Sequence, residues 1–189
     1  MISKRFDDHR LPNTSKHLIY MDPHADTNVS TVRTSIRHLE SGGAILIFPR
    51  GRVEPDPAVM PGAQESVRAW SPSVELFLRR VPQTQILVTI VSGVLSPVFL
   101  RNPLIKLWKG LGDPQTIAEV TQALTQMLFS KLVQLMPKIS FGIPQTVDEL
   151  LRNSETLYQS IITEASQLLN THIQHFSFTD IKKIKETRT

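Results

Sequence analysis

The sequence of 189 residues contains no cysteine, which excludes disulfide bonds, thiol nucleophiles and cysteine-based metal sites. Aromatic residues make up only 6% of the chain, and no clustered basic stripe accompanies them, which disfavours nucleic-acid binding. The most apolar run, residues 86–100, is broken by Ser-Gly and Ser-Pro pairs and is shorter than the ~20 residues that span a bilayer. No signal-peptide pattern opens the chain. These absences predict a cytoplasmic protein that meets a membrane only at its surface.

The composition that is present fits one globular domain. Hydrophobic residues account for 40% of the chain, and its length lies within the range of about 50–250 residues typical of a single domain. The formal net charge of +4 favours anionic partners such as lipid headgroups. We divide the chain into a polar segment at 1–16, a folded domain at 17–176 and a basic tail at 177–189.

Helix and strand patterns alternate along the domain. Strands are predicted at 17–22, 44–48, 85–94 and 138–142, the third as a fully buried strand of a parallel sheet. Helices are predicted from Asp26 to Gly42, from Ser71-Pro72, from Asp113-Pro114, and from a capping box at Thr146–Glu149 to about His175. The pattern predicts an α/β fold with a mixed, mainly parallel sheet flanked by helices.

The helix that begins at Asp113-Pro114 has a long apolar face. The residues that mark it recur at helical spacing: Ile117, Val120, Leu124, Met127, Leu128, Leu132 and Leu135. Such a face is typical of a helix that packs against a core. We therefore interpret Met127 and Met136 as core-filling side chains.

A turn with two arginines follows the strand predicted at 44–48. Its residues are Phe48, Pro49, Arg50, Gly51 and Arg52. In α/β sheets, ligands bind where strands end, and two guanidiniums bind a phosphate through forked, charge-assisted hydrogen bonds. The alternative is an ordinary connection with two solvated arginines. Both interpretations remain open from the turn alone.

The segment Gly42-Gly43-Ala44-Ile45-Leu46-Ile47-Phe48-Pro49-Arg50-Gly51 resembles the GG-x-x-x-I-F-P-E-G-T-R block of glycerolipid acyltransferases of the lysophosphatidic acid type. Weaker resemblances follow in the family's order at 18–22, 70–73, 86–93 and 138–144. The resemblance implies an acyltransferase-like sheet and transfer of an acyl chain from acyl-CoA or acyl-carrier protein to a lysophospholipid. It implies no cofactor or metal, contact with the membrane surface, and binding of the acceptor phosphate by residues 48–52.

The turn also departs from the family block. Arg50 stands where the family has glutamate, Arg52 where it has threonine, and Val53 where it has arginine. Reversing the charge at Arg50 strengthens the attraction for anions and removes the family's carboxylate. Arg52 is a candidate to replace the missing arginine, and Glu54 is a candidate auxiliary carboxylate.

The family's catalytic motif is H-x-x-x-x-D, in which the histidine is the general base for the acceptor hydroxyl. The chain holds one literal match, His17 and Asp22, which overlaps the predicted strand at 17–22. Side chains five residues apart on a strand point to opposite faces, so we interpret this match as fortuitous. In the family the motif precedes that strand, so we expect an N-terminally incomplete domain with impaired activity. The alternative is a non-catalytic basic protein that binds anionic lipid headgroups or nucleic acid.

Two further features carry weaker predictions. Residues 101–109 mix cations with leucine, isoleucine and tryptophan, as interfacial segments do. They are either a membrane contact or a plain surface loop. His172 and His175 are three residues apart on the last predicted helix, but metal sites require three or four donors. We therefore predict no metal site there.

Overall fold

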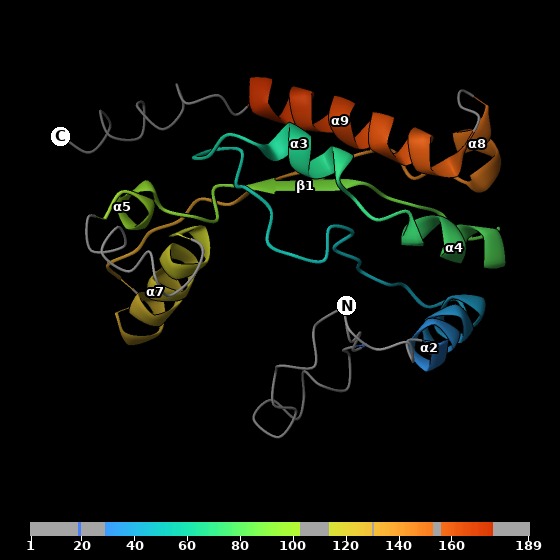
Figure 1. Cartoon of the computed structure of the whole chain (residues 1–189), viewed down its shortest axis with the longest axis horizontal. Helices are drawn as coiled ribbons and strands as arrows, with labels where there is room; N and C mark the ends of the chain where they lie inside the picture. Colours follow the sequence, from blue (N-terminus) through green and yellow to red (C-terminus); the bar gives the residue numbers. More distant parts are fainter. Residues whose placement is uncertain (1–18, 20–28, 103–113, 130, 153–155, 176–189) are drawn as a thin grey trace.

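The computed structural model describes residue 19 and residues 29–102, 114–129, 131–152 and 156–175 (Figure 1). These residues form a mixed helical and β structure in which helices predominate. The elements, in chain order, are α2 (Val29–Glu40), α3 (Ala63–Arg68), α4 (Ser73–Arg80), β1 (Thr89–Ser92), α5 (Pro97–Leu100), α7 (Pro114–Leu128), β2 (Lys138–Phe141), α8 (Val147–Leu151) and α9 (Leu157–His175).

The sheet formed by the described residues has two strands, and they are antiparallel. Thr89 pairs with Phe141 at one end of the register and Ser92 pairs with Lys138 at the other. The strand predicted at 138–142 is therefore confirmed, and the strand predicted at 85–94 is reduced to its central residues. Residues 44–48 form no strand, and the strand predicted at 17–22 lies outside the described residues except for residue 19. The mainly parallel sheet is not confirmed.

Among the described residues, one face of this sheet is covered and the other carries exposed side chains. Ile90 and Ser92 are buried against the helices, whereas Val91 between them is 42% exposed. On β2, Ile139 and Phe141 are 50% and 63% exposed. Alternation of this kind is typical of an antiparallel pair with one solvated face. The prediction that residues 85–94 are fully buried is therefore wrong.

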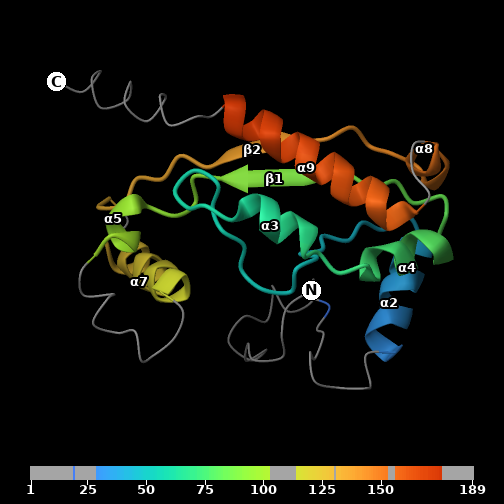
Figure 2. The same ribbon diagram turned by 45° about the horizontal axis from the view of Figure 1, so that its top comes forward.

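Helix α9 covers the buried face of the sheet and contributes to two clusters of the core. Its buried residues recur every third or fourth position: Leu157, Ile161, Ala165, Leu169 and His172. Ala165 and Leu169 pack with Val67 of α3 and with the sheet. Leu157 and Ile161 pack with Leu78 of α4 and Leu150 of α8. Figure 2 shows α9 lying along β1, with α3 beside it and α4 and α8 at its N-terminal end.

Several predicted helix ends are confirmed, but the helix predicted to carry an apolar face through Leu135 ends at Leu128. Helix α2 ends before Gly42, which has a φ of 82°. The amides of Gly42 and Gly43 donate to the carbonyls of Leu39 and His38, a Schellman arrangement. The capping box predicted at Thr146 and Glu149 is present, but it opens the short α8. The long helix predicted from there to His175 is two helices.

The apolar face predicted for the helix at Asp113-Pro114 points outward. Met127 is 83% exposed and Met136 is 54% exposed, so the prediction that they fill a core is wrong. The residues of α7 that pack on α5 and its flanks include the small Ala118. The spacing of apolar residues identifies the apolar face of a helix, but it does not show whether the protein buries that face.

The carboxylate of Asp56 joins the loop before α3 to the end of β1. Asp56 is 4% exposed, and its Oδ1 accepts hydrogen bonds from the amides of Ala58 at 2.9 Å and Gly93 at 3.0 Å. Its Oδ2 accepts from the amides of Val94 at 2.8 Å and Leu95 at 3.0 Å. Hydrogen bonds that a charged carboxylate accepts from backbone amides are stronger than hydrogen bonds between two neutral groups.

We predict that Asp56→Asn destabilises the fold by about 3 kcal/mol, because the new amide group faces two backbone donors and leaves them unsatisfied. Urea unfolding followed by circular dichroism measures the change. The control is Asp148→Asn, which removes an exposed carboxylate from the first turn of α8 and should cost less than about 1 kcal/mol. Equal losses in the two variants would contradict this account of Asp56.

Candidate functional site

The turn with two arginines has a defined backbone. The amide of Gly51 donates to the carbonyl of Phe48 at 3.1 Å, and the carbonyl of Pro49 accepts from the amide of Ser71 at 3.0 Å. Gly51 has a φ of 70°, and a Cβ built there would meet no atom within 4 Å. Glycine is therefore required for its left-handed conformation and not for space.

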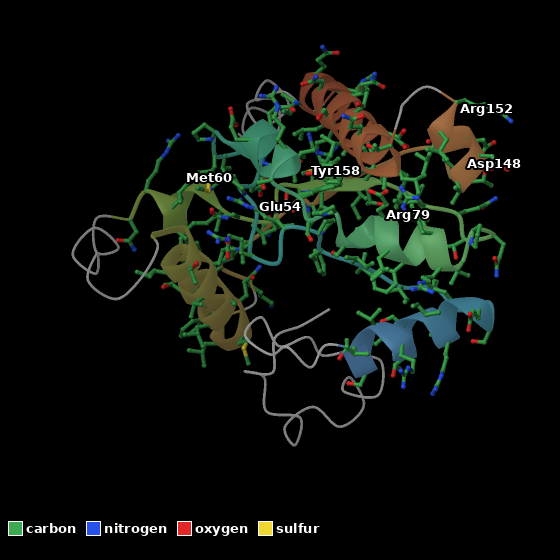
Figure 3. All side chains as sticks on the ribbon, turned by 45° about the vertical axis from the view of Figure 1, so that its right-hand side comes forward. Glu54, Met60, Arg79, Asp148, Arg152 and Tyr158 are labelled. Atoms are coloured by element: carbon green, nitrogen blue, oxygen red, sulfur yellow. The ribbon has the colours of Figure 1, made fainter. Side chains whose placement is uncertain are left out.

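Arg50 is held by a chain of hydrogen bonds. Its Nη1 donates to Ser66 Oγ at 3.0 Å, and Ser66 Oγ donates to Glu54 Oε2 at 2.9 Å. Trp70 Nε1 donates to Glu54 Oε1 at 2.8 Å. Figure 3 shows Glu54 on the loop beside α3. We call these four residues the Arg50 network.

Glu54 connects the network to the rest of the fold. Each of its carboxylate oxygens accepts one bond, from Ser66 and from Trp70. Its backbone carbonyl accepts from Gln115 Nε2 at 3.0 Å, which joins the loop to the start of α7. Ser66 itself is 1% exposed on α3. The carboxylate therefore fixes the hydroxyl that orients Arg50.

The arginines keep donors for a ligand. A guanidinium carries five N–H groups, and among the described residues Arg50 uses one of them, in the bond to Ser66. Arg52 lies two residues further on and is exposed. A half-buried guanidinium held by Ser66, with an exposed arginine two residues further along the same turn, can contribute to binding a tetrahedral oxyanion such as phosphate.

The structure brings together some of the site residues that were predicted from the sequence. Residues 48–52 form one turn, and Glu54 joins it through Ser66. His17 and Asp22 lie outside the described residues, as does most of the segment 101–109. Ser66 and Gln115 were not predicted, because no periodicity or spacing signal connects them with Arg50.

His172 lies in a buried polar cluster. Its Nε2 is 2.7 Å from Ser92 Oγ and its Nδ1 is 2.7 Å from Ser140 Oγ, and the residue is 1% exposed. Burial lowers the pKa of His172, the Asp56 carboxylate opposes that effect, and Lys138 adds to it. A ring enclosed in this way does not reach a substrate bound at the turn. It joins α9 to both strands.

His172 and His175 do not act together. His175 is exposed, whereas His172 is enclosed by the two serines. Within the described ranges, no group of three or more histidine, aspartate or glutamate side chains is placed to hold a metal ion.

A second concavity lies between α8, α9 and the segment after β2. Its volume is about 390 Å³, and Ile143, Arg152, Thr163 and Glu164 are among its lining residues. Glu164 Oε2 is buried and has no hydrogen-bond partner among the described residues. Burial raises the pKa of Glu164. This concavity shares no residue with the turn.

Comparison with protein-family models, curated proteins and solved structures gives no significant match to this chain. Among the helices in the described ranges, none has the length and apolar character needed to cross a membrane. The functional assignment therefore depends on the turn, the Arg50 network and the resemblance carried by residues 42–51.

We predict that His172 makes stability depend on pH. Burial lowers its pKa in the folded state below the value of about 6.5 for an unfolded chain, so the unfolded state binds more protons between the two values. The contribution is present above about pH 6.5 and is lost as the pH falls through the folded-state pKa. The free energy of unfolding should therefore fall more steeply from pH 7.5 to 5 for the wild type than for His172→Gln.

Urea titrations at several pH values measure this difference. His175→Gln removes an exposed imidazole and should keep the wild-type pH dependence. Parallel profiles for the wild type and His172→Gln would show that His172 does not titrate differently in the folded state.

Proposed function

We propose that residues 48–52 bind the phosphate of a glycerolipid headgroup, and that the chain is an acyltransferase-like protein whose acceptor is lysophosphatidic acid or another lysophospholipid. Acyl-CoA or acyl-carrier protein would be the acyl donor. The observation that supports this proposal most directly is the Arg50 network, which orients one guanidinium in a turn that also carries the exposed Arg52.

Phosphate is the ligand that this geometry suits best. A guanidinium gives two parallel donors to one phosphate, which a lysine cannot do. Because Ser66 already restrains Arg50, less side-chain entropy is lost when a ligand binds. The exposed Arg52 supplies a second cation in the same turn. Together the two arginines favour a doubly charged anion over a monovalent one.

The same proposal includes the detailed fold, which is a mainly parallel sheet of the acyltransferase type. An acyltransferase sheet would place residues 44–48 as a strand that ends at the turn, and it would have parallel neighbours. The described strands β1 and β2 are antiparallel, so the family fold stays a proposal carried by the resemblance.

We further propose that acyl transfer by this chain is impaired. The buried ring of His172 is enclosed by Ser92 and Ser140, and His38 Nε2 is 3.2 Å from the carbonyl of Ala44. Neither histidine has a hydrogen-bond contact with the Arg50 network. His17 and Asp22 lie outside the described residues and stay a low-ranking prediction. A non-catalytic protein that binds anionic headgroups is the second candidate, and the same two arginines support it.

We predict that Arg50→Ala and Arg52→Ala each weaken binding of sn-glycerol 3-phosphate about tenfold, since each removes a charge-assisted pair worth about 1.5 kcal/mol. Isothermal titration calorimetry measures the affinity. Arg80→Ala is the matched control, because it removes an exposed arginine at the end of α4. Unchanged affinity in both turn variants, or an equal loss in the control, would sink the phosphate-binding proposal.

We expect no transfer from labelled acyl-CoA to lysophosphatidic acid by this chain, because no histidine described here lies in the Arg50 network. The assay compares wild type and His17→Ala. Turnover that disappears in His17→Ala would identify His17 as the general base and would overturn our interpretation of that motif. Lipid binding with no turnover in either protein is the expected result.

A further inference from the structure

The face of α7 that contacts the protein combines small, polar and apolar residues, since Ile117 packs against the cluster of Leu95 and Ala118. Ala118 is fully buried and Gln122 is 5% exposed. Gln122 Nε2 donates to the carbonyl of Val94 at 2.7 Å, and Gln122 Oε1 accepts from the amide of Ser96 at 2.7 Å. The inner face thus packs on the segment after β1 through the hydrogen bonds of the Gln122 amide and through the apolar cluster that holds Leu95 and Ile117.

The opposite face of α7 is apolar and exposed. Four residues at helical spacing form what we call the outer stripe: Val120 (54% exposed), Leu124 (55%), Met127 (83%) and Leu128 (74%). Phe129 and Leu132 continue it at 58% and 73% exposure. A helix on the surface of a globular protein normally turns its apolar side inward. Contiguous exposed apolar residues mark an interaction surface.

The charged residues near the outer stripe indicate which kind of partner it binds. Residues 120–147 contain no aspartate or glutamate, but they contain Lys131 and Lys138. Lys131 is exposed and lies directly after the stripe. The whole chain carries a net charge of +4. The charged residue of α7 itself is Glu119, whose Oε1 accepts a hydrogen bond from Gln115 Nε2. An exposed apolar face that is followed by cations complements an anionic lipid surface, whereas a second copy would bring like charges together.

We propose that α7 is an interfacial helix that lies on an anionic lipid bilayer and buries the outer stripe among the acyl chains. Apolar burial drives the contact, and Lys131 adds attraction to the headgroups. The bond from Gln115 to the carbonyl of Glu54 joins the start of this helix to the loop of the Arg50 network. Figure 1 shows α7 beside α5, at the end of the sheet away from α4 and α8. The proposal stands whether or not the turn binds phosphate.

The absence of cysteine gives a direct test with the full chain. Met127→Cys and Ile143→Cys each create one labelling site, and both positions are at least 75% exposed. An environment-sensitive fluorophore at 127 should gain intensity and shift to the blue when vesicles of phosphatidylcholine and phosphatidylglycerol are added. The same label at 143, after β2 and next to the second concavity, should not respond.

Vesicle sedimentation measures the energetic side of the proposal. Leu124→Ser combined with Met127→Ser should partition about tenfold more weakly into these vesicles, because two apolar side chains no longer enter the bilayer. Ile143→Ser is the control for loss of an exposed apolar residue and should bind as the wild type does. Lys131→Ala should weaken binding to anionic vesicles but not to pure phosphatidylcholine.

The outcomes separate this proposal from its rivals. Wild-type partition of the double serine variant would overturn it, provided that circular dichroism shows both proteins folded. A dimer in multi-angle light scattering that the double variant abolishes would assign the stripe to a second copy instead and would also overturn it. Binding of sn-glycerol 3-phosphate should be unchanged in the double variant, so a failure of the membrane proposal is distinct from a failure of the phosphate site.

Discussion

The packing of α9 on a two-stranded sheet is the interaction on which the other elements depend. Two short antiparallel strands are marginal by themselves, and α9 covers one face of this pair with Ala165 and Leu169. His172 adds polar contacts at the same interface, because its two ring nitrogens meet Ser92 of β1 and Ser140 of β2. In a low-dielectric interior such paired contacts rigidify the structure. The helix therefore holds the strands in register as well as burying them.

The geometry of the candidate site depends on the packing of α9 against the sheet and α3. Val67 of α3 belongs to the α9 core cluster, and the preceding residue, Ser66, is directed to Arg50 and Glu54. Apolar burial of one side chain thus sets the position of the hydroxyl next to it. Asp56 fastens the same loop to the end of β1 through Gly93, Val94 and Leu95. The guanidinium of Arg50 lies on an irregular loop. It is oriented because Ser66 and Asp56 attach this loop to the core.

Local signals in the sequence predicted the helix boundaries well. These signals are the capping box at Thr146, the glycine pair at Gly42 and the prolines at 72 and 114. Each acts through neighbouring residues, so a short segment of sequence is enough to predict that a helix begins or ends there. Strand pairing and the Arg50 network join residues far apart in the chain. Residues 44–48 have the apolar pattern of a strand, yet they form none, because a strand also needs a partner edge. The bond between Arg50 and Ser66 has no sequence signal for the same reason.

Helix α7 shows the limit of periodicity most clearly. The spacing of Val120, Leu124 and Met127 identifies an apolar face, but it gives no direction for that face relative to the protein. The direction follows from Ala118 and Gln122, whose small size and amide bonds suit close contact with the segment after β1. Once that side faces inward, the apolar side faces outward, and its burial must come from another phase or partner. The cations that follow it, Lys131 and Lys138, are the reason for proposing an anionic bilayer as that partner.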